Sequence, residues 1–375
     1  MPRAKRDGLL IAGGGLAGSL AALAMAKLRP DVPLLLVEES DRFGGDHVWS
    51  FLDCEIEEEH RWLVDPLISH SWPGLYVSFP EYSRKLRMGY HSLRSARLDA
   101  AVRAALRPEQ YRLGTRVVAV RANELVLPGG EVIRADGAID ARGAANLSML
   151  ALGWRKFIGR EYSFKRPHRV DQPVLIDATV DQLQGFRFAY LLPMSETRLM
   201  VEDTYFTDTP ELDRAAIDKR IESYLALRGW KDGTLEREES GVLPIALSDD
   251  VHAFWRGGGA RVAKLGLRGG FFHPSTGYSL ADAVHTAIIL TEQRAFEGSA
   301  LHDLFEAEVT QLWRKREFYR SFNATLFEAP VRERRNIIES FYHLDADVIA
   351  RFYAAKLTMV DRMRLSSVKA AKPPR

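Results

Sequence analysis

The segment Asp7–Gly18 constrains the fold of this chain more than any other, because in it an apolar run ends in regularly spaced glycines. The run before position 13 is typical of a buried strand, and an alanine- and leucine-rich stretch follows the last glycine. In such a strand–turn–helix unit, Gly13 permits the tight turn, Gly15 lets the backbone approach a pyrophosphate, and Gly18 lets the helix pack on the strand. The helix start also offers free N–H groups and a positive dipole end. We therefore expect this unit to bind a nucleotide.

A second apolar strand supports this interpretation. The helix predicted over Leu20–Leu28 stops before Pro30, and the strand Leu34–Val37 then ends in Glu38, about 20 residues beyond the glycines. An acid at this distance binds the ribose hydroxyls of a dinucleotide, so Glu38 is a candidate for that role. The alternative is an ordinary glycine turn followed by an exposed acid.

The order of predicted strands and helices in the rest of the chain predicts two interwoven lobes. Strand–helix alternation breaks near position 45, strands and glycines return near 137 and 266, and residues 151–256 read as antiparallel strands. We predict an α/β fold with a discontinuous, Rossmann-like nucleotide-binding domain (1–150 and 257–300), of the glutathione reductase and p-hydroxybenzoate hydroxylase type. An inserted, mainly antiparallel β substrate domain (151–256) and a helical C-terminal region (301–375) complete it.

The discontinuity favours FAD over NAD as the bound dinucleotide, because a nicotinamide dehydrogenase usually completes its nucleotide domain in one continuous run. A second fingerprint is not found after a strand, since Gly257–Val262 lacks the third glycine, so a dedicated NADPH domain is not expected.

Composition excludes several other classes of protein. The chain has 375 residues, 46% of them hydrophobic, which is enough for a sizeable core, and its formal net charge of +2 does not indicate a nucleic-acid binder. Cys54 is the only cysteine, so an internal disulfide is excluded and a structural metal site is not expected. A single cysteine also fits a protein of the reducing cytoplasm. An apolar run of the roughly 18 residues that span a bilayer is also lacking.

The segment Gly266–Leu280 is a third glycine-containing region with a helix start. Ser279 is placed to cap the following helix, whose free N–H groups would face an anionic group. A reduced flavin is such an anion. The alternative is a capped loop without a ligand, and His273 within it would then be a structural hydrogen-bonding residue.

The chain resembles the bacterial lycopene β-cyclases, flavoproteins that close the ends of lycopene into β-rings, over nearly its whole length. Small departures are Asp46 where Asn is usual, Val48 where Thr is common, and Val201 where Ile is common. Arg268 stands where related folds place an acid that binds the ribityl chain of the flavin. The motifs that carry the resemblance are Gly13–Gly18, Gly45–Phe51, Phe188–Pro193, Val201–Thr204, Leu243–Ile245, Phe272–Ser279 and Ile349–Thr358.

The resemblance implies an isomerisation without net redox change. Lycopene would pass through a monocyclic carotene to β-carotene, and NADPH or another cellular reductant would keep FAD reduced. Ring closure needs a proton on the terminal double bond, attack by the next double bond, and loss of a proton. A carboxylic acid must be buried to stay protonated, and an anion must stabilise the cation. At about 4 Å and an effective dielectric near 20, a reduced flavin would contribute about 4 kcal/mol, close to three decades in rate.

Glu202 is the first candidate for the acid or base, with Asp203 beside it and His273 as a second candidate. Adjacent strand residues face opposite sides of a sheet, so only one member of the pair Glu202–Asp203 can face the substrate. The alternative is a solvent-facing acid of a strand. Aromatic candidates for the lining are Trp49, Tyr190, Phe271, Phe272 and Tyr278. Candidates for cofactor binding are Gly13, Gly14, Gly15, Leu16, Ala17, Gly18, Glu38, Arg97, Asp140, Gly269, Gly270, Pro274, Thr276, Gly277 and Tyr278.

A long polyene must arrive from a membrane, so we expect a cytoplasmic protein that associates peripherally with the membrane surface. An interfacial helix face would place aromatic side chains among basic ones. The alternative is a core helix with a solvated basic face. The residues proposed for the interfacial face are Trp313, Phe318, Tyr319 and Phe322 among Arg314, Lys315, Arg316 and Arg320.

Two other functions remain open at this point. One is a flavin hydroxylase or reductase of an isoprenoid, which would change the oxidation level of its substrate. The other is a non-enzymatic flavin or carotenoid carrier, for which Glu202 would be dispensable.

Overall fold

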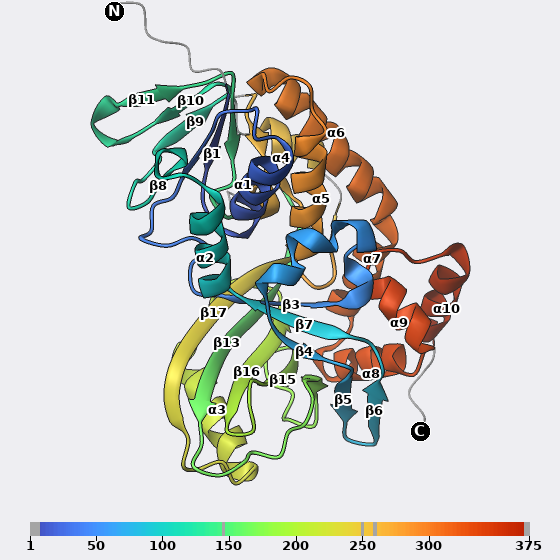
Figure 1. Ribbon diagram of the computed structural model, residues 1–375. Coiled ribbons are helices and arrows are strands. Elements are labelled where there is room, and N and C mark those ends of the chain that lie inside the picture. Colours follow the sequence, from blue (N-terminus) through green and yellow to red (C-terminus); the bar gives the residue numbers. More distant parts are fainter. Residues whose placement is uncertain (1–7, 145–146, 249–250, 258–260, 371–375) are drawn as a thin grey trace, which may run out of the picture.

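The structure is a computed structural model that describes residues 8–144, 147–248, 251–257 and 261–370. Residues 258–260, just after the expected domain boundary at 256/257, and the tail 371–375 therefore lie outside the described residues. The chain forms two lobes, each built on its own sheet, with the C-terminal helices beside them (Figure 1).

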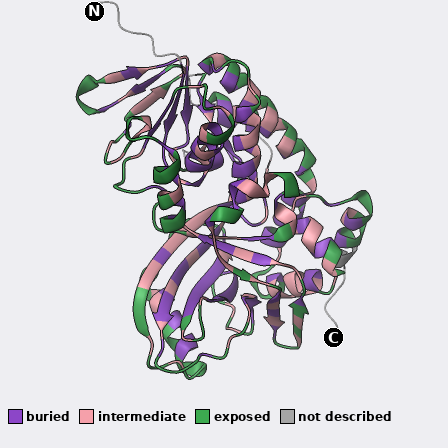
Figure 2. Ribbon diagram, in the orientation of Figure 1, coloured by how far each residue is buried: buried purple, intermediate pink, exposed green. Residues whose placement is uncertain are grey.

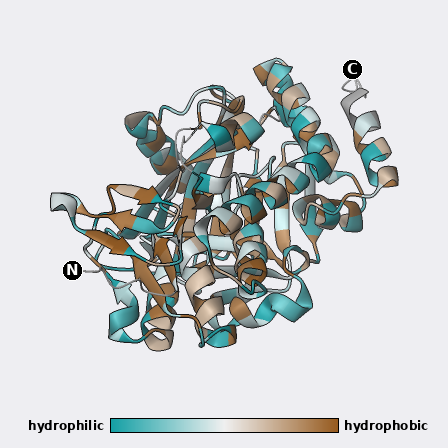
Figure 3. Ribbon diagram, turned by 90° about the horizontal axis from the view of Figure 1, so that it is seen from above, coloured by the Kyte–Doolittle hydropathy of each residue, from teal (hydrophilic) through white to brown (hydrophobic). Residues whose placement is uncertain are grey.

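The first sheet is parallel and has the strand order β18-β12-β1-β2-β8. The central strand, LLIA, and the adjacent strand LLLV are fully buried, and strands near the N-terminus are mainly hydrophobic (Figures 2 and 3). Such continuous apolar runs occur where both faces of a parallel sheet are covered. The strands are β1 (Leu9–Ala12), β2 (Leu34–Val37), β8 (Tyr111–Arg112), β12 (Gly137–Asp140) and β18 (Ala263–Lys264).

Different layers cover the two faces of this sheet. Helices α1 (Leu16–Leu28), α5 (Leu280–Thr291) and α6 (Gly298–Lys315) contribute to the core on one face, which contains Leu9 and Ile11. The other face packs against a three-stranded antiparallel sheet. The strands of that sheet are β9 (Ala119–Arg121), β10 (Glu124–Val126) and β11 (Val132–Arg134).

The second lobe is built on a seven-stranded sheet with the order β17-β13-β16-β15-β14-β5-β6. One face of it packs on α3 (Arg214–Leu227) through Ile217 and Ile221, and the other face is turned toward the C-terminal helices. The strands are β5 (Leu75–Phe79), β6 (Tyr82–Leu86), β13 (Leu152–Ser163), β14 (Val174–Asp177), β15 (Phe186–Pro193), β16 (Arg198–Thr207) and β17 (Thr234–Ala246).

Residues 75–86 differ from the predicted domain organisation, which assigned all of 1–150 to the nucleotide-binding domain. The hairpin β5–β6 instead completes the second sheet, where β5 pairs in parallel with β14 about 100 residues later. A nearby three-stranded antiparallel sheet follows position 45, where the strand–helix alternation breaks. It consists of β3 (Val48–Leu52), β4 (Ile68–Trp72) and β7 (Tyr90–Arg94), and α2 (Ser95–Ala105) follows it.

The C-terminal region is helical, as expected, but the residues proposed for an interfacial face are largely buried. Trp313, Tyr319 and Phe322 are buried, and Arg316 forms a buried bidentate ion pair with Asp282. These aromatic residues join the cores beneath the helices and are not available to a membrane. The helices are α7 (Glu317–Glu328), α8 (Val331–Tyr342), α9 (Ala346–Tyr353) and α10 (Met359–Ala370), and a short helix α4 (Val251–Arg256) precedes β18. Among the described residues, none of the helices has the length and apolar character needed to cross a bilayer.

Candidate active site

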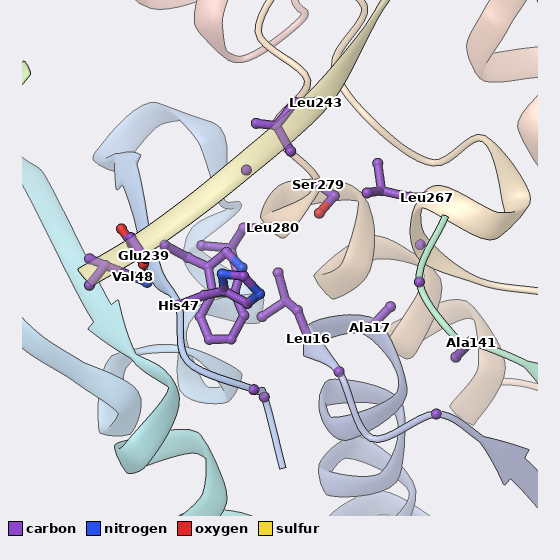
Figure 4. A pocket seen from close by; sticks show the side chains of 18 of the residues that line it. Leu16, Ala17, His47, Val48, Ala141, Glu239, Leu243, Leu267, Ser279 and Leu280 are labelled. Atoms are coloured by element: carbon purple, nitrogen blue, oxygen red, sulfur yellow. Dashed lines mark hydrogen bonds between the residues drawn. The ribbon is translucent and has the colours of Figure 1, made fainter. Parts of the chain in front are cut away.

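A cavity of about 450 Å³ lies where the two lobes meet. The starts of α1 and α5 close one side of it, and the strands β13, β16 and β17 close another. The side chains of Leu16, Leu280 and Glu239 are drawn around the same space in Figure 4. The cavity therefore joins the expected nucleotide-binding unit to the second sheet.

The glycine turn has the three features that its spacing predicts. Gly13 has a φ of 100°, which favours glycine. A Cβ on Gly18 would lie 2.0 Å from the carbonyl oxygen of Gly13, whereas a Cβ on Gly15 would meet no atom within 4 Å. The turn thus packs tightly at Gly18 and is open at Gly15, where Gly15, Leu16 and Ala17 line the cavity.

Glu38 lies at the end of β2, beside this turn. Its Oε2 accepts a hydrogen bond from the Gly14 N–H at 2.6 Å and its Oε1 accepts one from the Ser40 N–H at 2.9 Å. Glu38 lines the cavity. Gly14 and Gly18 do not, and they pack instead against Phe43 and against the carbonyl oxygen of Gly13. This arrangement fits an acid that receives the ribose of a dinucleotide.

The second helix start, at α5, also faces the cavity. Gly277 has a φ of 72°, and it lines the cavity together with Tyr278, Ser279 and Leu280. Ser279 occupies the N-cap position but its side chain makes no capping hydrogen bond, contrary to expectation. Uncapped N–H groups at a helix N-terminus favour an anionic ligand.

Together, the open glycine turn, Glu38 and the two helix starts fit FAD. The cradle at Gly15, which a Cβ would fill, and the uncapped start of α5 are the observations that support this fit. The residues that would hold FAD are therefore Gly13, Gly15, Leu16, Ala17, Glu38, Gly277 and Tyr278.

Other predicted cofactor residues lie outside this cavity. Arg97 is exposed and donates to the carbonyl oxygen of Ile68. Asp140 is buried in an ion pair with Arg142 and lies 3.1 Å from the Arg268 guanidinium. The carboxyl group of Asp140 is therefore already paired with two arginines. Its charge also explains how Arg268 is accommodated beside Gly269 and Gly270.

The residues 269–276 hold the fold together rather than line the cavity. The carbonyl oxygens of Gly269 and Gly270 accept hydrogen bonds from the indoles of Trp255 and Trp313. The carbonyl oxygen of Pro274 accepts hydrogen bonds from Ala246 N–H and the Asn323 amide, and Thr276 lines a different, smaller cavity.

Glu202 points into the main cavity from β16. It is only 3% exposed, and burial raises the pKa of its carboxyl to about 7. Arg155, whose Nη2 lies 3.5 Å from Oε1, and the donating hydroxyl of Thr204 oppose that rise. A carboxyl poised in this way holds a proton for a substantial fraction of the time at neutral pH.

Asp203 points to the opposite face of the sheet, as strand alternation requires. Its Oδ1 accepts a hydrogen bond from Arg187 Nε at 2.7 Å, and Arg220 lies 4.0 Å from Oδ2. Asp203 does not line the cavity. The structure therefore assigns it to a buried ion pair, and the catalytic expectation for Asp203 is corrected.

His273 is also placed away from the cavity. Its Nδ1 accepts a hydrogen bond from Ser275 N–H at 3.1 Å, so Nε2 carries the proton and donates to the carbonyl oxygen of Phe352 at 2.9 Å. Burial lowers the pKa of His273 to about 4. A neutral imidazole with both nitrogens bonded to backbone ties this loop to α9, and the expectation that His273 carries a proton is corrected.

A smaller cavity of about 70 Å³ adjoins the main one between the seven-stranded sheet and helices α7, α8 and α9. Arg155 and Tyr278 line both cavities, with the Arg155 guanidinium 4.8 Å from the Tyr278 ring centroid. The rest of its wall is mainly aromatic and aliphatic: Leu175, Ile176, Phe186, Phe188, Phe206, Phe322, Leu326, Ile338, Phe341, Tyr342, Phe352 and Tyr353.

Of the aromatic candidates, Trp49, Tyr190 and Tyr278 line the main cavity, while Phe271 and Phe272 are buried in the core of the first lobe. Sequence reasoning missed Arg155 and Glu239, which also line the cavity. The signal that could have found them is strand alternation, because Arg155 and Glu239 lie on long strands in which every second residue faces the same side. Their cross-strand partners, however, come from distant segments of the chain.

Structural comparison supports the flavoprotein fold. A geranylgeranyl bacteriochlorophyll reductase-like protein from Thermoplasma acidophilum matches with a TM-score of 0.64 at 13% identity, covering 97% of this chain and 96% of that one. A flavin-dependent brominase matches with a TM-score of 0.60 at 14% identity, covering 97% of this chain and 98% of that one. These similarities confirm the predicted fold class.

Sequence comparison identifies the family. The family model "Lycopene cyclase protein" matches residues 8–375. The lycopene beta-cyclase of Pantoea ananas is 41% identical, and that of Pseudescherichia vulneris is 38% identical, each alignment covering 98% of this chain and 94% of the relative. The resemblance inferred from the motifs is thereby confirmed, and the chain belongs to the lycopene cyclase family.

Proposed function

We propose that this protein is a lycopene β-cyclase, which converts lycopene through a monocyclic carotene to β-carotene. The observation that carries the proposal is Glu202, a buried carboxyl with a raised pKa at the wall of the cavity beside the nucleotide-binding turn. A protonated carboxyl in a water-poor cavity can donate to an alkene, for which an ordinary exposed acid is too weak.

The residues around the glycine turn and the start of α5 would hold FAD. In its reduced form, FAD would supply a negative charge that stabilises a cation, with NADPH or another cellular reductant as the electron source. The chain itself would supply the proton through Glu202, whose side chain is buried where the two lobes meet. Excluding water protects a carbocation from capture.

The smaller aromatic cavity suits the substrate. Lycopene is an apolar polyene, and most of the wall consists of Phe, Leu and Ile side chains, which would contact a hydrocarbon chain. Because Arg155 and Tyr278 border both cavities, a polyene end could reach Glu202 from this side.

The experiment that tests the proposal is expression in cells that accumulate lycopene, followed by chromatography and mass spectrometry of the pigments. We expect cyclic carotenes with the mass of lycopene, because cyclisation only rearranges bonds. A changed mass would indicate the hydroxylase or reductase alternative. Unchanged lycopene beside FAD-loaded protein would favour the carrier and contradict the proposal.

The raised pKa of Glu202 predicts a pH dependence. The protonated form is the acid, so the rate should fall as the pH rises through about 7. The groups that set this value are Arg155 and Thr204, which favour the ionised form, and Glu239, which disfavours it. The check is the initial rate with lycopene in liposomes between about pH 6 and pH 9, at saturating reduced FAD. A rate that stays constant across this range would contradict the assignment.

Helix α10 offers a surface for peripheral membrane association, in place of the buried residues considered first. Met359, Val360 and Met363 are 71%, 52% and 60% exposed, and Arg362 and Arg364 flank them. Exposed apolar side chains at i and i+4 beside basic ones suit insertion into an anionic lipid interface. Helix α10 is joined to α9, which borders the aromatic cavity, by the ion pair of Asp361 with Arg351.

Replacing Met359 and Met363 together with Gln is expected to weaken binding to anionic liposomes about tenfold, because two apolar side chains would no longer enter the bilayer. Co-sedimentation measures this. The control is Leu227→Gln, which changes a side chain that is 86% exposed on α3, away from α10 (Figure 1). Equal loss in both variants, or none in either, would assign membrane binding to another surface.

A further inference from the structure

Glu239 and Glu202 lie in the same row of the seven-stranded sheet. Gly159 on β13 is paired with Glu202 on β16 and with Glu239 on β17, so the three residues follow one another across neighbouring strands. Residues directly opposite in adjacent strands project to the same face. Both glutamates accordingly line the main cavity, and the side chain of Glu239 is seen against it in Figure 4.

Gly159 leaves a gap between the two carboxyl groups. A Cβ at this position would lie 3.4 Å from Oε2 of Glu202 and 3.5 Å from Cγ of Glu239, so both side chains lean over the bare glycine. Strands are about 4.8 Å apart, which places the backbones of the two glutamates about 10 Å from each other. Both carboxyl groups therefore face the same part of the main cavity, where one end of a bound substrate could meet both.

The two carboxyl groups have different partners. Oε2 of Glu239 accepts hydrogen bonds from Arg237 Nη2 at 2.8 Å and from Val48 N–H at 2.9 Å. These two donors favour the ionised form. Glu202, in contrast, has Arg155 only at 3.5 Å and accepts from the Thr204 hydroxyl. Burial raises the pKa of both carboxyl groups, and in Glu239 the Arg237 guanidinium and the Val48 N–H oppose that rise. Glu239 accepts from a charged donor at 2.8 Å, whereas Arg155 lies 3.5 Å from Glu202, so these contacts stabilise the ionised form of Glu239 more than that of Glu202.

We propose that Glu239 is a second catalytic residue, the base that removes the proton from the newly closed ring, while Glu202 is the acid that starts closure. This assignment rests on the proposed cyclase function. The O–H bond of Glu202 breaks as its proton adds to the terminal double bond. The next double bond then gives its electron pair to the new carbon–carbon bond, and the positive charge moves to the far carbon of that double bond.

Loss of a proton completes the ring. The C–H electron pair beside the cation becomes the ring double bond, and the proton passes to Oε1 of Glu239. Glu202 is then ionised and Glu239 protonated, so each ring takes up one proton and releases one. Exchange with solvent restores both groups, and no oxidant or reductant is consumed.

A base fixed on one side of the ring also decides which neighbouring carbon loses its proton. Without it, the cation would lose a proton from whichever adjacent carbon another acceptor reaches, and the double bond would be displaced. The identity of the ring product therefore reports on Glu239 independently of the rate.

The test compares Glu239→Gln with Glu238→Gln in the FAD-loaded, reduced protein. Glu238 is the adjacent residue on β17, paired with Arg160 outside the cavity, and its variant should keep wild-type rate and product. Arg237 remains paired with Asp46 in Glu239→Gln, so the fold should persist. We expect the cyclisation rate of Glu239→Gln to fall about 100-fold at every pH. Any ring product should be enriched in displaced double bonds, and Glu239→Asp should restore part of the rate.

Several results would overturn the assignment. One is a loss of less than tenfold in Glu239→Gln with β-rings as the product. Another is an unchanged maximal rate with only the basic limb of the pH profile moved to lower pH, since Glu239 would then act only through the pKa of Glu202. If the wild-type protein forms no cyclic carotene, the proposed function itself fails. If it does so and Glu239→Gln matches it, only the role of Glu239 fails.

Discussion

Glu202→Gln is expected to lower the cyclisation rate by about 10²–10⁴-fold, the range typical of removing a positioned acid. The amide keeps the size of the carboxyl but has no acidic proton. Because the pKa of Glu202 is raised to about 7, the native residue is already protonated about half of the time near neutral pH. The amide imitates this neutral state, so folding and flavin binding should persist. Pigment chromatography after a timed reaction, with flavin absorbance as a measure of loading, checks both expectations.

Asp203→Asn is the matched control, because the neighbouring acid faces the other side of the sheet. This change weakens the buried ion pair with Arg187, and breaking such a pair costs about 3–5 kcal/mol of stability. We expect a lower thermal midpoint with a turnover per folded, flavin-loaded molecule close to that of the wild type. Full activity in Glu202→Gln, or equal loss of turnover in both variants, would remove the special role of Glu202.

Gly15→Ala and Gly18→Ala should separate cofactor binding from folding. A Cβ on Gly15 meets no protein atom within 4 Å, and the backbone φ of −68° suits alanine, so the apoprotein should keep its thermal midpoint. The added methyl would occupy the space in which a pyrophosphate approaches the backbone. We expect a loss of FAD affinity of about 100-fold, measured by titration of the apoprotein with FAD.

Gly18→Ala should behave differently. Its Cβ would lie 2.0 Å from the carbonyl oxygen of Gly13, so α1 must shift away from the turn. The expected result is a thermal midpoint lower by several degrees in the apoprotein, together with weaker FAD binding. Unchanged FAD affinity in Gly15→Ala would show that the cofactor does not approach this turn.

Local features of the site could be predicted from the sequence. The roles of Gly13, Gly15 and Gly18 depend on neighbouring residues, and the choice between Glu202 and Asp203 follows from strand alternation. The pattern showed that only one acid could face the substrate, and the resemblance favoured Glu202.

Features that depend on distant segments could not be predicted. Glu239 joins Glu202 only through the register of β17, β13 and β16, which no local pattern fixes. The aromatic–basic run near Trp313 fitted a membrane face as well as a core helix, and only its packing against Gly270 and Phe272 decides between them. The structural role of His273 could not be predicted for a similar reason, because its hydrogen-bond acceptor, the carbonyl oxygen of Phe352, lies 79 residues away in the sequence.

The hairpin β5–β6 makes the two lobes inseparable. Strand β14 has β5 as its neighbour on one side, so a fragment containing residues 151–256 alone would expose an unpaired strand edge, which is a site for aggregation. During synthesis, β14 emerges about 100 residues after β5, so the two strands cannot pair until then. Non-local pairing of this kind slows folding. The second lobe consequently cannot be exchanged between relatives by replacing residues 151–256 alone. Part of its sheet, the hairpin β5–β6, belongs to the sequence of the predicted nucleotide-binding domain.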